Sequence, residues 1–430
     1  MNAIADSLDR SLPALVDLYK DLHAHPELAF QEHRTASVVA QRLRTLGWNV
    51  TTGVGRTGVV AVLRNGPGPT IMLRADMDAL PVRENTGLDY ASTRTADGPD
   101  GSTIPVMHAC GHDIHVTCLI GACALLSERA TAWQGTVVAV FQPAEESGLG
   151  AQAMVDDGLF ERFPRPTVLL GQHVGPGPAG MVAKVPGTVM AAADSITVRL
   201  YGRGGHGSKP ETTVDPVVMA ASLVGRLQSI VSRMVPSQES VVITVGSIKA
   251  GITAATIPDE AELGINVRTF NPGVRRRVID AIARLAKAEA LAADAPRQPD
   301  LITGYHLPAT VNDPDQTEYV ACVHEGVFGP EAVIPMGPNT ASEDFGVLAQ
   351  AAQVPSVFWF FGGNDPEEFQ QALCADRLAE DIPPNHSSLF APAPRPTIST
   401  GVQALLGAAL AYLEGPHADA APAAAGTARA

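Results

Sequence analysis

Three short apolar segments of the chain are followed at once by side chains that commonly bind metal ions. Residues 70–74, 135–141 and 167–171 have the length and composition of buried β-strands. The polar residues that follow them are Asp76, Asp78, Glu145, Glu146 and His173. In open α/β sheets, ligands bind beyond the carboxyl ends of the strands. The pattern therefore predicts an α/β fold with a ligand site at one edge of its sheet.

Residues 105–115 contain a second group of ligand-type side chains. Cys110 and His112 are two residues apart, so in an extended segment or a tight turn both side chains leave the same side of the backbone. This arrangement suits two ligands of one metal ion or of a pair of ions. Asp113 would cap the apolar helix expected over residues 114–126 or orient a ligand histidine. The segment alone is also compatible with a thiol nucleophile, so both chemistries stay open here.

Length, charge and cysteine content limit the class of protein. A chain of 430 residues is long enough for two domains with separate cores. A formal charge of −15 leaves no basic face for phosphates, so we expect a small-molecule substrate and no nucleic acid. Five cysteines without framework spacing fit a reducing cytoplasm. We find no secretory signal and no run of eighteen apolar residues, so we expect a cytoplasmic protein that does not cross a membrane.

The first part of the chain has the pattern of helices followed by strands. Residues 10–46 are expected to form two helices around a break at His25 and Pro26. The apolar runs 59–63 and 70–74 flank a Gly/Pro-rich turn, which favours a β-hairpin. A further buried strand is expected over residues 355–361.

A second domain interrupts the first. We expect it to contain strands at 194–201, 240–248 and 261–269 and helices at 215–235 and 272–293. This order indicates a small sheet with two helices on one face. The glycine loop 202–208 is unlike a dinucleotide site, because the strand before it alternates and no acidic residue closes a second strand at the expected distance. The Ala/Pro-rich residues 416–430 are expected to be disordered.

Seven motifs of the chain occur together: residues 21–27 (DLHAHPE), 74–81 (RADMDALP), 107–113 (MHACGHD), 142–146 (QPAEE), 205–208 (GHGS), 342–345 (SEDF) and His386. They resemble the motifs of the M20 metallopeptidase family, in its amidohydrolase branch. That branch includes hippurate hydrolases, N-acyl-amino-acid amidohydrolases and hydrolases of auxin–amino acid conjugates. The resemblance covers residues 15–413, and the combination of motifs is highly specific.

The resemblance implies a fold and a domain arrangement. Residues 1–187 and 300–415 would form a metallopeptidase-like catalytic domain, in which a central, mostly parallel mixed sheet lies between helices. Residues 188–299 would form an inserted α+β lid that also dimerises, giving a homodimer. Two positions differ from the family pattern. Ala255 replaces an asparagine of the lid and Gly175 replaces a tryptophan, and both concern substrate preference.

The resemblance also implies the roles of individual residues. Each subunit would hold two divalent metal ions. Their ligands would be Cys110, His112, Glu146, His173 and His386, with Cys110 in the bridging place. Glu145 would be the general base. His206 would act from the lid, across the dimer interface, as a donor to the developing oxyanion. Arg268 would pair with the carboxylate of the substrate.

These roles predict hydrolysis of the amide bond of N-acyl amino acids by a metal-activated water. The thiolate ligand favours Zn²⁺, while Mn²⁺ and Co²⁺ are also compatible. A dipeptidase or aminopeptidase-like exopeptidase of the same family is an alternative. A cysteine hydrolase is another, although Cys110 and His112 are too close in sequence for a well-formed thiol–imidazole pair. A non-enzymatic binding protein would be expected to lack the base, whereas Glu145 is present.

Overall fold

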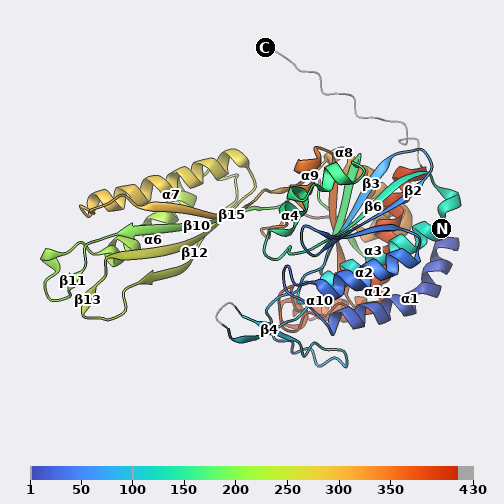
Figure 1. The fold of residues 1–430 in the computed structure, drawn as a ribbon, viewed down its shortest axis with the longest axis horizontal. Helices are drawn as coiled ribbons and strands as arrows, with labels where there is room; N and C mark the ends of the chain where they lie inside the picture. The colour runs from blue at the N-terminus through green and yellow to red at the C-terminus, as the bar shows by residue number, and fades with distance from the viewer. Residues whose placement is uncertain (1, 99–100, 415–430) are drawn as a thin grey trace, which may run out of the picture. The chain divides into compact units, whose positions relative to one another are not determined.

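The computed structural model describes residues 2–98 and 101–414, which divide into two compact units (Figure 1). Unit 1 comprises Met1–Gly187, Val311–Gly337 and Asp344–Ala430, and unit 2 comprises Thr188–Thr310 and Pro338–Glu343. After its long excursion into unit 2, the chain re-enters unit 1 after residue 310, whereas we had expected it to do so after residue 299. The cause is a strand that the sequence analysis did not predict, β15 (Asp300–Leu307), which pairs with β10 (Ala192–Tyr201) of unit 2. The expectation for residues 416–430 lies outside the described residues.

Unit 1 is built on an eight-stranded sheet with the order β1-β2-β6-β3-β7-β18-β8-β17. Its strands are β1 (Asn49–Val54), β2 (Gly58–Asn65), β3 (Thr70–Asp76), β6 (Gly135–Gln142), β7 (Val168–Pro178), β8 (Val182–Lys184), β17 (Val333–Pro335) and β18 (Ser356–Asn364). The central pairs β6/β3, β3/β7 and β7/β18 are parallel, while β1/β2, β2/β6 and β18/β8 are antiparallel. The expected mixed sheet with a parallel centre is confirmed.

The hairpin expected from residues 59–63 and 70–74 is wrong. β6 lies between β2 and β3 and pairs with β2 in the antiparallel direction and with β3 in the parallel direction. Both β2 and β3 are buried over most of their length, so each has a partner on both sides. A buried strand next to a Gly/Pro turn therefore does not have to pair with its neighbour in sequence.

Helices bury both faces of this sheet. α1 (Asn2–His23), α2 (His33–Thr45), α3 (His112–Glu128) and α12 (Pro394–Glu414) pack together in the main core. On the other face, Phe345 of α9 (Phe345–Ala352) packs against Phe358 of β18, with ring centroids 4.9 Å apart. The remaining helices of unit 1 are α4 (Gly150–Asp156), α5 (Leu159–Arg162), α8 (Pro314–Phe328), α10 (Pro366–Cys374) and α11 (Leu378–Asp381), and a small β4/β5 pair joins Thr95–Asp97 to Thr103–Pro105.

Within the described residues, α12 is the one helix with the length and hydropathy of a membrane span. In the fold, 72% of its most apolar window is buried against α3, α8, α1 and the sheet. The apolar composition of α12 is therefore that of a core helix.

Unit 2 has a four-stranded antiparallel sheet with the order β12-β14-β10-β15. β12 is Val241–Ala250 and β14 is Glu260–Thr269, and α6 (Pro216–Arg233) and α7 (Pro272–Ala292) pack on one face of the sheet. Ile196, Val198 and Leu200 of β10 belong to this core, as expected of an alternating strand. β11 (Gly205–His206) pairs with β13 (Thr256–Ile257). The chain passes between the units at β9 (Gly187–Met190) and β16 (Thr310–Asn312), and again after Gly337 and after Glu343.

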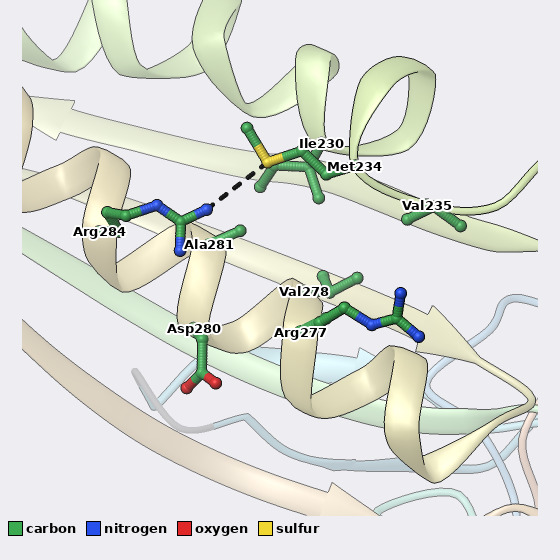
Figure 2. Close-up of a pocket in the computed structure, with 8 residues that line it drawn as sticks. All are labelled: Ile230, Met234, Val235, Arg277, Val278, Asp280, Ala281 and Arg284. Carbon is green, nitrogen blue, oxygen red and sulfur yellow. Dashed lines mark hydrogen bonds between the residues drawn. The ribbon is translucent and has the colours of Figure 1, made fainter.

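A groove of about 190 Å³ lies between α6 and α7 (Figure 2). Ile230, Val278 and Ala281 line it with apolar atoms, and Arg277 and Arg284 stand at its sides. The Arg284 guanidinium donates to the sulfur of Met234 at 3.7 Å. The lining contains no histidine or cysteine, so the chemistry predicted from the sequence is located elsewhere.

Candidate metal centre

The structure brings the five expected metal ligands together at the carboxyl edge of the unit 1 sheet. They come from the start of α3, the loop after β6, the strand β7 and the loop before Phe390. Cys110 Sγ lies 3.5 Å from His173 Nε2 and 3.2 Å from His386 Nε2. Glu146 Oε1 lies 3.3 Å from His386 Nε2 and 3.8 Å from His112 Nε2.

These separations fit donor atoms around divalent cations. Bonds of about 2.0–2.1 Å to nitrogen and about 2.3 Å to sulfur place neighbouring ligands of a tetrahedral zinc ion roughly 3.3–3.6 Å apart. His112 Nε2 and Glu146 Oε1 are buried and make no hydrogen bond of good geometry within the described residues. Buried polar atoms of this kind call for a partner, which a cation would supply. Cys110 belongs to two ligand groups, one with His112 and His173 and one with Glu146 and His386, as a shared ligand would.

The surroundings of the two histidines nearest Cys110 give them different charges. His173 Nδ1 donates to the carbonyl oxygen of Val174 at 2.8 Å, so the Nε2 lone pair faces Cys110. Burial lowers the pKa of His173 well below its usual value, which keeps the ring neutral. Contacts with Cys110 and Glu146 raise the pKa of His386 to about 10. Without a cation His386 is therefore protonated at neutral pH.

Cys110 needs a cation to become a thiolate. Burial and then the charge of Glu146 raise the pKa of its thiol. A bound divalent ion reverses this preference, because it stabilises the anion directly. Burial alone would lower the pKa of His112, but the charge of Asp76 and the contact with Asp78 raise it well above its usual value.

Asp76 contacts the site through other side chains. Its Oδ2 accepts from Arg74 Nη1 at 2.6 Å and its Oδ1 accepts from His115 Nδ1 at 2.5 Å. His115 Nε2 in turn accepts from the backbone N–H of Val174 at 2.8 Å. The His115 ring lies 5.4 Å from that of His112 and 4.5 Å from that of His173, measured between centroids. Our site prediction did not include His115, although its i,i+3 spacing from His112 places both on one helix face.

Asp78 holds the loop that carries the two glutamates. Its Oδ1 and Oδ2 accept from the backbone N–H groups of Glu145 and Glu146, each at 3.0 Å. The same Oδ1 lies 3.3 Å from His112 Nδ1, which leaves His112 Nε2 facing the cluster. Glu145 Oε2 lies 3.9 Å from that Nε2. The adjacent glutamates therefore both reach the cluster from a fixed backbone.

The two remaining predicted site residues belong to unit 2. His206 is exposed, and its Nδ1 accepts from the backbone N–H of Ser208 at 3.1 Å, so the neutral ring carries its proton on Nε2. Arg268 on β14 donates from Nε to Asn266 Oδ1 at 2.8 Å and from Nη1 to the Ser342 hydroxyl. Neither residue forms an ion pair with a carboxylate in the part of the chain that the structure describes.

Comparison with known proteins identifies the family. Residues 72–372 match the sequence profile of peptidase family M20/M25/M40. The chain belongs to the M20/M25/M40 peptidase family. Hippurate hydrolase from Campylobacter jejuni is 36% identical over 356 residues, which cover 81% of this chain and 90% of the relative. N-acetyl-L-cysteine deacetylase from Bacillus subtilis is 35% identical over 369 residues, which cover 85% of this chain and 84% of the relative.

A solved M20 structure shows the same fold. The Bacillus subtilis YXEP protein, described as a dinuclear metal binding peptidase from the M20 family, matches with a TM-score of 0.76 and 27% identity. The match covers 94% of this chain and 99% of that protein. The resemblance to the M20 family that we drew from the sequence motifs is therefore confirmed.

Proposed function

We propose that this M20 family protein hydrolyses the amide bond of N-acyl amino acids, releasing a carboxylic acid and a free amino acid. The observation that carries the proposal is the cluster of Cys110, His112, Glu146, His173 and His386 with Glu145 beside it. Hippurate hydrolase and N-acetyl-L-cysteine deacetylase are among the relatives of the chain. Their names describe substrates of this class.

We infer that Cys110, His112, Glu146, His173 and His386 would hold two divalent cations per subunit, and that Cys110 would serve both of its ligand groups. The donor set of one thiolate, three imidazoles and one carboxylate favours Zn²⁺ and is compatible with Mn²⁺ or Co²⁺. When bound, such cations lower the pKa of water and polarise a carbonyl group.

Glu145 supplies the proton transfer in this proposal. It accepts a proton from the attacking water and passes it to the leaving nitrogen. Glu146 faces His112 and His386, so it serves as a ligand while its neighbour handles the proton. The two hydrogen bonds from the loop backbone to Asp78 keep both carboxylates in place.

Two residues of unit 2 complete the proposed site. Arg268 pairs with the α-carboxylate of the substrate, and its hydrogen bond to Asn266 fixes the plane of the guanidinium group. His206 donates from Nε2 to the carbonyl oxygen as negative charge develops there. We propose that His206 reaches the site of the partner subunit in a homodimer formed by unit 2. A cytoplasmic location is supported by the five free cysteines.

A cysteine hydrolase is the alternative that the geometry addresses most directly. Cys110 faces two imidazole nitrogens, as a nucleophile could. However, burial raises the pKa of its thiol, whereas nucleophilic cysteines have a lowered pKa. Chelator treatment separates the two mechanisms, because thiol attack needs no metal.

The substrate class is tested with matched compounds. Each N-acyl amino acid is assayed beside its C-terminal amide and beside a dipeptide with a free amino group, and the released amine is measured. We expect the acids to be cleaved, with a cost of about 2–5 kcal/mol when the carboxylate is blocked, since Arg268 then lacks its partner. Equal rates on acids and amides would show that Arg268 does not pair with the substrate carboxylate. Preference for the dipeptides would favour the exopeptidase alternative.

A further inference from the structure

The loop that carries Glu145 is held by two buried carboxylates through three consecutive backbone N–H groups. Glu145 and Glu146 donate to Asp78, as described above. The preceding residue, Ala144, donates to Glu32 Oε1 at 2.8 Å. Glu32 immediately precedes α2, more than one hundred positions earlier in the chain, and its side chain is fully buried.

Ala144 has a backbone conformation that alanine does not choose by itself. Its φ angle is +53°, in the left-handed region. Its carbonyl oxygen accepts from the Ser147 hydroxyl at 3.0 Å and from the Gly150 N–H at 3.1 Å. The residue is thus held on one side by its own turn and on the other side by Glu32. Left-handed non-glycine residues persist where the surroundings over-determine them, and this one directly precedes the proposed base.

Two further hydrogen bonds hold the Glu32 carboxylate in place. Its Oε1 also accepts from the Phe30 N–H at 2.9 Å, and its Oε2 accepts from the Thr57 hydroxyl. Within the described residues, no hydrogen bond or ion pair joins the Glu32 side chain to any of the five ligands. The hydrogen bond by which Glu32 reaches the loop that carries Glu145 is the one from the Ala144 N–H.

We propose that Glu32 is a positioning residue that keeps Glu145 aimed at the reacting water by holding Ala144 in its left-handed conformation. The inference rests on the proposed role of Glu145 as the base. Removing Glu32 lets Ala144 relax toward negative φ, which rotates the following peptide and displaces the Glu145 carboxylate. Small displacements of a catalytic group can lower kcat roughly 100-fold.

The test compares three variants with the wild-type protein. Glu32→Ala removes the acceptor, and we expect kcat to fall about 10- to 100-fold with KM within about twofold. Glu32→Gln keeps one oxygen for the Ala144 N–H and can donate to Thr57, so it should restore most of kcat. Glu27→Ala is the matched control: Glu27 also accepts three hydrogen bonds near the start of α2, from Arg34 N, Thr35 N and Thr35 Oγ1, but does not touch the loop.

A second measurement does not depend on activity. Amide hydrogen exchange of the peptide spanning residues 143–149 should be faster in Glu32→Ala than in the wild type and unchanged in Glu27→Ala. If Glu32→Ala does not fold, Glu32→Asp replaces it, because the shorter side chain keeps the charge and withdraws the acceptor. Unchanged kcat and exchange in the Glu32 variants, or an equal loss in Glu27→Ala, would overturn the inference. Failure of the wild-type protein to cleave any N-acyl amino acid would instead reject the proposed function.

Discussion

At the scale of single residues, Glu145 and Glu146 are adjacent and chemically identical, yet their surroundings differ. Glu146 Oε1 lies 3.3 Å from His386 Nε2, whereas Glu145 Oε2 lies 3.9 Å from His112 Nε2. We therefore predict that Glu145→Gln keeps both metal ions and the fold but lowers kcat by roughly 10²–10⁴-fold. Glu146→Gln should lower the metal affinity. Metal analysis and kinetics on both proteins check this, and the reverse pattern would exchange the two roles.

His23 provides a second prediction at this scale, concerning stability. Its Nδ1 lies 2.7 Å from Asp113 Oδ2 and its Nε2 lies 3.1 Å from Glu84 Oε1. Burial would lower the pKa of His23, but hydrogen bonds to these two carboxylates raise it from 6.5 to about 9. A group with a raised pKa in the folded state stabilises below its unfolded pKa, and this stabilisation is lost as the pH rises through the folded pKa.

Because the pKa of His23 is raised in the folded state, its contribution to stability should decrease as the pH rises. The difference in unfolding free energy between wild type and His23→Gln should be largest below pH 6.5 and should shrink by roughly 3 kcal/mol as the pH rises past about 9. Denaturant unfolding of both proteins across this range measures it. Parallel stability curves would mean that His23 is not charged in the native state.

The sequence was sufficient to predict which five ligand-type side chains lie together in the structure, but not the residues that support them. Ligand-type side chains after apolar strands are visible without a structure. The motif resemblance assigned different roles to Glu145, as the base, and to Glu146, as a ligand. Whether Asp76 binds a metal or an arginine depends on where the Arg74 and His115 side chains point. The contact between Glu32 and Ala144 joins segments that no periodicity connects.

At the scale of elements, the start of α3 is the most demanding local structure of the site. Gly111, between Cys110 and His112, has a φ angle of +81°, and a Cβ atom there would overlap Val174 of β7. Gly111→Ala should therefore lower the free energy of unfolding by about 1–3 kcal/mol and weaken metal binding.

Gly47→Ala is the control for this prediction. Gly47 has a similar φ of +85° but no atom within 4 Å of the added Cβ, and it is not near a ligand in sequence. The control should lose some stability and keep the metal affinity. Equal metal affinity in both variants, measured by titration, would show that the close approach of Gly111 to Val174 is not needed by the site.

The short strand β11, which follows β10, gives the prediction for unit 2. His206 Nε2 carries the proton of the neutral ring, so His206→Ala should raise the barrier by about 2.7–4 kcal/mol and leave the metal content unchanged. Mixing Glu145→Gln and His206→Ala subunits tests whether His206 acts across a dimer, because one site in each mixed dimer would hold both wild-type groups. Proven subunit exchange without recovered activity would confine His206 to its own subunit or remove it from the site.

Element types were easier to predict than strand pairing. Strands and helices near the predicted ranges are present in both units. The hairpin was wrong because β6, some sixty residues later, separates β2 from β3. β15 was missed because it is an edge strand whose central residues are exposed, so its sequence lacks the alternation that marks a half-buried strand.

At the scale of the whole molecule, one site collects side chains from four separate stretches of unit 1. The parallel centre of the sheet makes this possible, since the carboxyl ends of β3, β6 and β7 meet at one edge. The order of these strands could not be predicted from apolar runs alone. Residue order and motif identity nevertheless predicted which side chains would lie together at one edge of the sheet.

In the proposed mechanism, the cluster around Cys110 holds the divalent cations needed for hydrolysis. The most direct test removes metal with a chelator, verifies its absence by elemental analysis, and measures hydrolysis of an N-acyl amino acid as Zn²⁺, Mn²⁺ or Co²⁺ is returned in known equivalents. We predict no hydrolysis in the metal-free protein and a rise that levels off at two equivalents per subunit. Full hydrolysis by protein shown to be metal-free would contradict the account.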